Sequence, residues 1–148
     1  MATLTTSEYQ ELKEFFRFFS ERYDKLTNIA PEHHPLFVLE QMELRAPSRA
    51  KQGLLMAAND CVEQSSHWSN ERVVTLDQEL AALGILTLSR VRKCYSKKYE
   101  GIIQRGRIRN EVELYLTQGI LADQSLTISA DERENLEQML EAYVHKAL

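Results

Sequence analysis

Apolar residues along this chain recur every three or four positions, a spacing that places them on one face of an α-helix. The first helix is expected over residues 7–26, where Ser7 and Gln10 form a capping-box pattern. Its apolar stripe comprises Tyr9, Leu12, Phe15, Phe16, Phe19, Tyr23 and Leu26. Phe18 lies off this stripe, which leaves it either exposed or in contact with a partner.

Breaks in this periodicity divide the rest of the chain into further helices. Pro31 and Pro35 exclude helix continuation through residues 28–35. The later pattern predicts helices over residues 36–45, 48–66, 88–104, 108–121 and 130–146, and one or two helices over residues 70–83. Capping residues are expected at Thr87 and Ser129 and within the Thr75–Gln78 pair, and helix-ending glycines at Gly84 and Gly106.

No stretch of the sequence alternates apolar and polar residues long enough to predict a strand. The fold class expected is therefore all-α, a compact bundle of about six helices. A length of 148 residues is sufficient for a hydrophobic core and fits one domain over residues 1–148. Cys61 and Cys94 have no metal-binding spacing and are expected as reduced thiols, although a disulfide between them stays open.

The basic residues are unevenly distributed. Eight of the 18 Lys and Arg residues lie in residues 90–110, a segment with a single acidic residue, Glu100. Residues 1–89 carry eight basic and thirteen acidic residues, and residues 111–148 carry two basic and eight acidic ones. A strongly basic segment in a chain of net charge −4 indicates a surface for an anionic partner.

On a continuous helix over residues 88–104, the apolar positions form one stripe: Leu88, Val91, Tyr95, Tyr99 and Ile102. Arg90, Lys93 and Lys97 fall on the opposite side, which predicts a basic ridge facing solvent. Arg92 and Lys98 flank the stripe and are expected to bury their stems while their charged ends stay in water. The residues expected to bind a partner or an anion are Arg90, Lys93, Lys97, Arg105, Arg107 and Arg109.

Two classes of macromolecule fit such a surface. The first is a protein with an acidic face, which makes the chain a small non-catalytic interaction protein of the adaptor, immunity or antitoxin kind. The alternative is DNA or RNA; a loose helix-turn-helix pattern would give Ser89, Arg90, Lys93 and Lys97 a recognition role. A pI near 5.6 weighs against nucleic acid. A third interpretation needs no partner: the ridge is an ordinary solvated helix face, which Glu111, Glu113 and the acidic run 131–141 neutralise within the fold.

The sequence contains no motif of a known catalytic class, so no enzymatic activity is expected. An enzyme of unrecognised type is the least favoured of the three functions, after protein binding and nucleic-acid binding. No cofactor and no metal are expected, because the adjacent pair His33 and His34 lacks further ligands. No targeting segment or long apolar run is present, which predicts a cytoplasmic protein that does not interact with membranes. A homodimer is left open, because the apolar face around Phe15–Phe19 is wide enough to contact a second copy.

Overall fold

The computed structural model describes residues 4–24, 29–123 and 128–147, and these residues form helices and connecting loops without a strand. The helices are α1 (Thr6–Tyr23), the 3₁₀ helix η1 (Pro31–His33), α2 (Pro35–Arg45), α3 (Pro47–Gln64), α4 (Asn70–Ala82), α5 (Leu88–Tyr95), α6 (Lys97–Arg105), α7 (Glu111–Ala122) and α8 (Ala130–Ala147). The all-α prediction is confirmed, with more α-helices among the described residues than the six or so expected. Leu26, the last residue of the predicted first stripe, lies outside the described residues.

The chain divides into two compact units, Met1–Cys61 and Val62–Leu148, here called unit 1 and unit 2. The boundary falls within α3, whose last turn belongs to unit 2. The prediction of a single helical domain over residues 1–148 stays a prediction.

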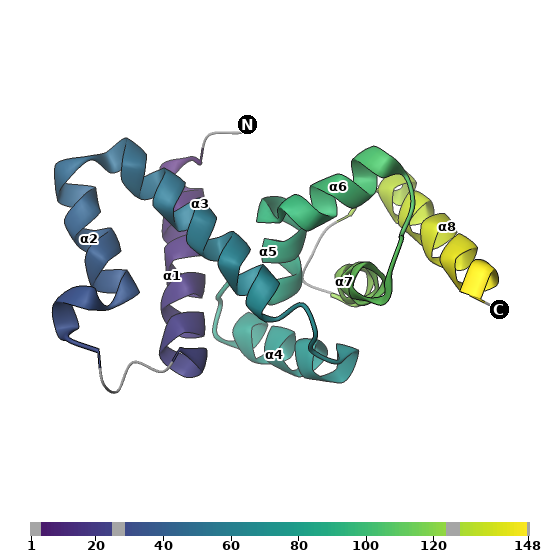
Figure 1. Cartoon of the computed structure of the whole chain (residues 1–148), viewed down its shortest axis with the longest axis horizontal. Coiled ribbons are helices and arrows are strands. Elements are labelled where there is room, and N and C mark those ends of the chain that lie inside the picture. The colour runs from purple at the N-terminus through teal and green to yellow at the C-terminus, as the bar shows by residue number, and fades with distance from the viewer. Residues whose placement is uncertain (1–3, 25–28, 124–127, 148) are drawn as a thin grey trace. The chain divides into compact units, whose positions relative to one another are not determined.

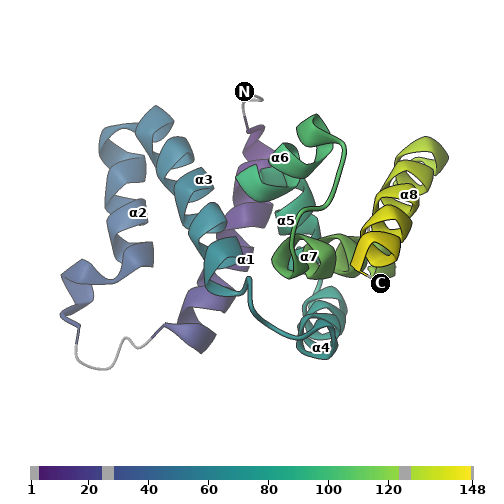
Figure 2. The same ribbon diagram turned by 45° about the vertical axis from the view of Figure 1, so that its right-hand side comes forward.

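Unit 1 consists of α1, η1, α2 and most of α3, with α2 packed against α1 and the chain reversing at Ala46 between α2 and α3 (Figures 1 and 2). The predicted stripe of α1 is buried at Tyr9, Leu12, Phe15, Phe16 and Phe19. Phe18 is half-buried beneath the Arg22 guanidinium, which lies 4.8 Å from its ring centre. The off-stripe position of Phe18 is thus covered within α1.

In unit 2, α7 is the central helix, since it packs against α4, α5, α6 and α8 (Figures 1 and 2). It has enough apolar residues to contact several neighbouring helices, and Leu116 and Ile120 are buried. Gly119 lies against α5, where an added Cβ would come within 3.4 Å of the Ser89 hydroxyl. This close approach packs α5, the helix that carries Arg90 and Lys93, directly against α7.

Two of the predicted capping patterns are wrong, and two predicted caps are confirmed. The cap of α1 lies two residues earlier than expected, because the capping box is made by Thr5 and Glu8 instead of Ser7 and Gln10. Thr75 lies inside α4, a single helix capped by Ser69, and its hydroxyl donates to a backbone carbonyl. Thr87 and Ser129 accept hydrogen bonds from the backbone N–H groups of Arg90 and Glu132, as caps do.

Gly106 ends α6 with a φ of +76°, in the left-handed region that side chains disfavour. We expect Gly106→Ala to lower the free energy of unfolding of unit 2 by about 1 kcal/mol. Gly101 is the matched control, because it lies within α6 and an added Cβ there would meet only ordinary contacts. Gly101→Ala is expected to stabilise unit 2 by about 0.5–1 kcal/mol. Urea unfolding of both variants measures the opposite signs, and equal effects would contradict this role for Gly106.

Candidate interaction surface of unit 2

The six cationic residues predicted to bind a partner all lie in unit 2, on α5 (Arg90, Lys93), on α6 (Lys97, Arg105) and in the loop before α7 (Arg107, Arg109). They do not form the single ridge that was predicted. The helix expected over residues 88–104 is interrupted at Ser96, whose backbone is extended. The Ser96 hydroxyl accepts from the backbone N–H groups of Lys98 and Tyr99 and so begins a new helix.

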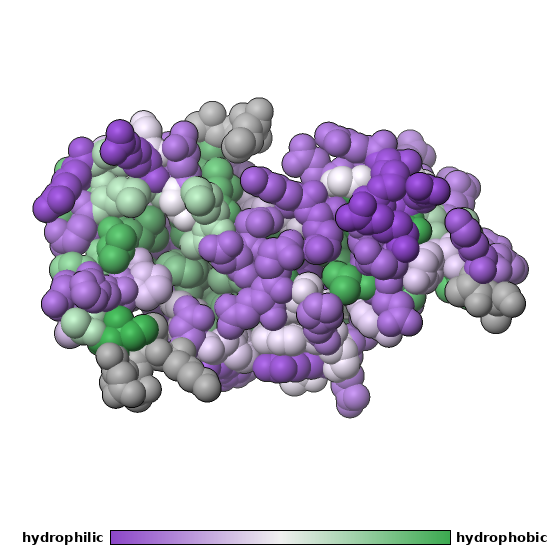
Figure 3. Space-filling view, in the orientation of Figure 1, coloured by the Kyte–Doolittle hydropathy of each residue, from purple (hydrophilic) through white to green (hydrophobic). Residues whose placement is uncertain are grey.

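These cationic residues differ in how far they reach solvent. Arg90, Lys97, Arg107 and Arg109 are exposed, whereas Lys93 and Arg105 are half-buried. We call the six residues together the basic surface. Figure 3 shows hydrophilic side chains gathered over α6 and the loop that follows it, the region that carries much of this surface.

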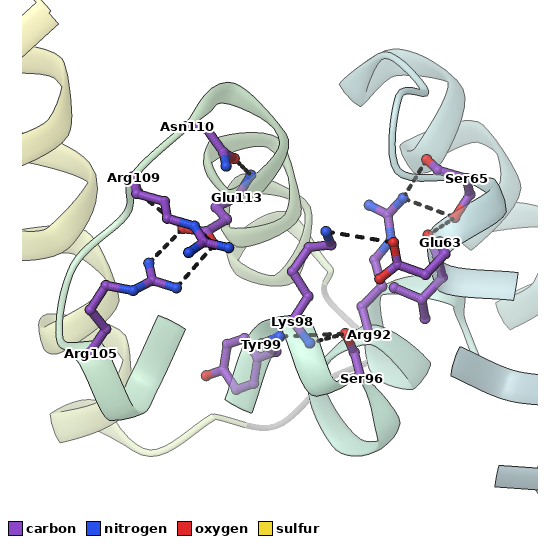
Figure 4. Close-up of polar contacts among 11 residues, drawn as sticks. Glu63, Ser65, Arg92, Ser96, Lys98, Tyr99, Arg105, Arg109, Asn110 and Glu113 are labelled. Atoms are coloured by element: carbon purple, nitrogen blue, oxygen red, sulfur yellow. Dashed lines mark hydrogen bonds and ion pairs between the residues drawn. The ribbon is translucent and has the colours of Figure 1, made fainter. Parts of the chain in front are cut away.

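Glu113 organises one end of the basic surface. Its side chain is buried, with 1% exposure for the residue, at the start of α7 (Figure 4). Its two carboxylate oxygens accept hydrogen bonds from Arg105 Nη1 at 2.8 Å and Nη2 at 3.2 Å. Arg109 adds its backbone N–H at 3.0 Å and its Nε at 3.1 Å. One carboxylate therefore holds two arginines and the loop between them.

The ionic partners of Glu113 also determine its protonation. Burial by itself would raise the pKa of Glu113, but hydrogen bonds from Arg105 and the Arg109 backbone and the two positive charges outweigh burial. The pKa of this carboxyl is therefore lowered, and Glu113 is ionised at neutral pH. Asn110 caps α7 by accepting from the Glu113 backbone N–H at 2.9 Å, so the carboxylate also lies where the helix dipole favours a negative charge.

The acidic C-terminal helix neutralises only part of the basic surface. Glu132 of α8 lies 3.4 Å from Lys93 Nζ and accepts a hydrogen bond from the Tyr99 hydroxyl at 2.7 Å. Glu137 and Glu141 lie within ion-pair distance of residues of α8 itself, Arg133 and His145. The acidic run therefore reaches the basic surface through Glu132, and the rest of its ion pairs that the structure describes stay within α8.

Arg92 is a correction to the sequence analysis. Its charged end was expected in water, but the residue is 2% exposed and donates through Nη2 to the carbonyl and the hydroxyl of Ser65, at 2.8 and 3.1 Å (Figure 4). Burial lowers the pKa of Arg92 to about 10, opposed by the charge of Asp77. Lys98 is half-buried and lies 3.6 Å from Glu63. Both cations therefore interact with residues of unit 2 itself.

The same buried region contains two carboxylates. Asp77 of α4 accepts hydrogen bonds from the backbone N–H and the hydroxyl of Ser89, and Asp123 accepts one from Thr87. Burial raises the pKa of Asp77 to about 6, with hydrogen bonds from Ser89 opposing the rise and the nearby Asp123 adding to it. Ser89 is 0% exposed. The predicted recognition role of Ser89 in a helix-turn-helix is therefore wrong, because its side chain points into the core.

Outside unit 2, the structure contains a cavity of about 240 Å³ in unit 1, lined by Thr6, Tyr9, Gln10, Glu43, Pro47, Ala50 and Lys51. At its edge, Glu43 accepts hydrogen bonds from the Tyr9 hydroxyl at 2.6 Å and from Lys13 Nζ at 3.1 Å. Burial alone would raise the pKa of Glu43, but these two hydrogen bonds and the charge of Lys13 lower it. The wall of this cavity thus contains an ionised carboxylate that already has two partners.

The remaining candidate residues of the sequence, the cysteines and histidines, do not come together in a site within the described residues. Over the ranges that the structure describes, no group of three or more His, Cys, Asp or Glu side chains is placed to hold a metal ion. Cys61 is a buried thiol and Cys94 an exposed one, and neither forms a disulfide. His34 Nε2 lies 3.1 Å from the Ile29 carbonyl oxygen. Within those same ranges, no helix has both the length and the apolar character needed to cross a bilayer.

Unit 2 therefore presents exposed arginine and lysine side chains on α5, on α6 and in the loop before α7. Comparison with known proteins adds no name to this description. No family model, curated protein or solved structure matches the chain.

Proposed function

We propose that the chain is a small, non-catalytic, cytoplasmic interaction protein, of the adaptor, immunity or antitoxin kind, that binds an acidic face of another protein through the basic surface of unit 2. The observation that carries this proposal is the Glu113 cluster. Arg109 pairs with Glu113 while 63% of its side chain stays exposed, and the exposed Arg107 lies in the same short loop. A buried carboxylate thus fixes a loop that offers guanidinium groups to solvent.

Such pre-organisation favours binding, because a partner does not have to order the loop. The Arg107 carbonyl accepts a hydrogen bond from Arg105 Nη1 at 2.9 Å, so the loop is held from both sides. Guanidinium groups in a fixed position match the planar geometry of carboxylates and form bidentate hydrogen bonds. Carboxylates on a protein surface are therefore the ligand chemistry that this loop fits.

The charge pattern favours a protein over nucleic acid. Lys93, Arg105 and Arg109 each lie within ion-pair distance of a glutamate of unit 2. Exposed Glu100 lies within α6, and exposed Glu111 begins α7 directly after the loop that carries Arg107 and Arg109. A phosphate backbone carries negative charge of one sign, so these glutamates would oppose it. A protein surface with both signs of charge can pair with arginines and glutamates alike.

Charge reversal tests the proposal. Arg90 and Arg107 are exposed and have no ion pair among those found in the described residues, so Arg90→Glu with Arg107→Glu leaves the Glu113 cluster in place. We expect the double variant to capture its protein partner from native lysate about tenfold or more weakly than the wild type, at equal protein concentration and low salt. Quantitative mass spectrometry of the captured proteins measures this loss.

The control reverses the same amount of charge elsewhere. Arg45→Glu with Arg49→Glu alters two exposed arginines of unit 1 and is expected to leave capture unchanged. Equal capture by both double variants and the wild type would rule out the basic surface as the binding site.

Nucleic-acid binding through the same surface is the alternative outcome of a second measurement. Fluorescence anisotropy with labelled duplex DNA and RNA, at low and moderate salt, detects it directly. Binding that weakens steeply with salt, with a log–log slope of about −0.9 for each phosphate contacted, and that is lost in the Arg90→Glu, Arg107→Glu variant would replace the protein-partner proposal. We expect no binding of either duplex beyond that of the Arg45→Glu, Arg49→Glu control.

A further inference from the structure

The C-terminal helix α8 is anchored in unit 2 by few buried residues. It has 18 residues, as many as α1, and seven residues of α1 are buried. Among the residues of α8 whose burial the structure describes, Leu136 and Met139 are the buried ones. Figures 1 and 2 show α8 at the edge of unit 2 beside α7, its main packing partner. Because apolar burial is the main force that holds a helix in a fold, α8 is weakly anchored for its length.

This weakly anchored helix is acidic and contacts the basic surface through one carboxylate. Residues 130–147 carry five acidic and two basic side chains. Glu132 Oε1 lies 3.4 Å from Lys93 Nζ and accepts a hydrogen bond from the Tyr99 hydroxyl at 2.7 Å. Ser129 accepts from the Glu132 backbone N–H at 3.1 Å, which fixes this residue in the first turn of α8. The start of α8 therefore holds a carboxylate against α5 and α6.

Lys93 is the member of the basic surface that Glu132 covers. The side chain of Lys93 is 20% exposed and that of Glu132 is 30% exposed, so Lys93 has little surface left for the carboxylate of a partner. Ion pairs that water still reaches are modest and are screened by salt. A carboxylate from outside can therefore compete with Glu132 for the same ammonium group.

We propose that α8 is an autoinhibitory element of the basic surface: Glu132 occupies Lys93 and Tyr99, and an acidic partner that engages Lys93 binds by replacing Glu132 and releasing the first turn of α8. This inference rests on the proposed function, because it concerns the regulation of the same surface. The exposed Arg90 and Arg107 need no such exchange. Since the open form of Lys93 is only a fraction of the population, α8 weakens binding in proportion to that fraction.

A labelled acidic peptide tests this competition. Fluorescein-labelled hexaglutamate is titrated with the full-length chain at about 0.1 M salt and read by fluorescence anisotropy. Glu132→Gln is expected to bind the peptide about threefold to fivefold more tightly than the wild type, because Lys93 has lost its counter-charge. The amide oxygen can still accept from the Tyr99 hydroxyl, so this variant is expected to fold normally, which circular dichroism verifies.

Glu134→Gln is the matched control. It removes the same charge from the same helix, but Glu134 is exposed and lies about 200° around α8 from Glu132. This variant is expected to change the affinity for hexaglutamate by less than about 1.5-fold, since salt screens a charge that does not contact the basic surface. Equal affinities of Glu132→Gln and Glu134→Gln would overturn the proposal.

Hydrogen exchange of the wild type tests the release of α8 itself. With saturating hexaglutamate, amides at the start of α8 are expected to exchange at least about threefold faster, while those of α7 keep their rates. Unchanged or stronger protection of α8 would also overturn the proposal. Absence of binding to both the wild type and Glu132→Gln would contradict the proposed function and autoinhibition together. Binding that Arg90→Glu with Arg107→Glu removes, combined with equal affinities of the two glutamine variants, would contradict autoinhibition alone.

Discussion

Replacing Glu113 by Gln is expected to lower the free energy of unfolding of unit 2 by about 3 kcal/mol. The carboxylate is buried and accepts from two arginines, so its neutral isostere would leave their charges without a counter-charge. The side-chain NH2 group of the glutamine, itself a donor, would also face the N–H donors of the guanidinium groups. The loss is kept near the lower end of the range for buried pairs because Arg105 and Arg109 can turn partly toward water.

Tryptophan fluorescence makes this measurement specific to unit 2. Trp68 is the only tryptophan of the chain and lies in unit 2, with the Arg72 guanidinium 3.8 Å from its ring centre. Urea unfolding followed at this residue therefore reports the unit that contains Glu113. Glu111→Gln is the control, because Glu111 is exposed two residues away and its substitution is expected to change stability by less than about 0.5 kcal/mol. Indistinguishable midpoints for the two variants would show that the cluster does not stabilise unit 2.

Unit 2 is also expected to become more stable as the pH falls from 7 to about 5. The pKa of Asp77 is about 6 in the fold, compared with 3.8 for the unperturbed group. Between these values the folded state keeps a proton that the unfolded state has lost, so the free energy of unfolding decreases as the pH rises. A difference of about two pKa units corresponds to about 3 kcal/mol over the whole titration, of which about 1.4 kcal/mol develops between pH 5 and 7.

The groups that face Asp77 explain this direction. Ser89 donates two hydrogen bonds that favour the ionised form, but burial and the nearby Asp123 favour the protonated form and prevail. Glu113 acts in the opposite direction, because its lowered pKa makes its contribution disappear only below about pH 4.5. Measurements between pH 5 and 7.5 therefore isolate the effect of Asp77 from that of Glu113.

Asp77→Asn provides the matching variant. The amide has the same size, can accept from the Ser89 backbone and can donate to its hydroxyl, so the fold is expected to be retained. The variant is expected to show a flat stability profile from pH 5 to 7.5 by Trp68 fluorescence, where the wild type loses stability as the pH rises. A wild-type profile as flat as that of the variant would mean that Asp77 titrates as an ordinary exposed carboxyl.

The parts of the fold that could be predicted from the sequence depend on neighbours within one helical turn or two. The buried stripe of α1 follows from residue spacing alone, and Thr87 and Ser129 cap the helices that they were expected to cap. The left-handed glycines Gly84 and Gly106 end their helices where predicted. In each case the physical cause lies in the local backbone and in a side chain a few residues away.

Prediction failed where two local signals compete. Thr5 and Ser7 both lie at the start of α1, and only the full set of hydrogen bonds places the cap at Thr5. Ser96 lies in a pattern that reads as one continuous helix, yet its hydroxyl begins α6. Hydroxyl side chains bond either to solvent or to the backbone at similar cost, so spacing alone does not decide between these outcomes.

The sequence predicted which residues belong to the candidate site, but not the hydrogen bonds and ion pairs that they form. The location of the basic residues is a property of the sequence, whereas the burial of Arg92 against Ser65 joins residues 27 positions apart. Glu113 was treated as one of several flanking acids, although its place three residues after Asn110 matches a helix-capping pattern. That signal could have located Glu113 at a helix start, but its pairing with Arg105 depends on how the loop turns at Gly106.

The interruption at Ser96 leaves the basic segment as two helices of eight and nine residues. Helices this short do not persist in water without support, since isolated helices need about 12–15 residues to be even marginally stable. A synthetic peptide covering residues 88–110 is therefore expected to be a random coil that carries the same charges without their spatial arrangement. Under the proposed function, recognition through the basic surface would be coupled to the integrity of unit 2, and a partner that binds this arrangement would distinguish the folded protein from the unfolded one.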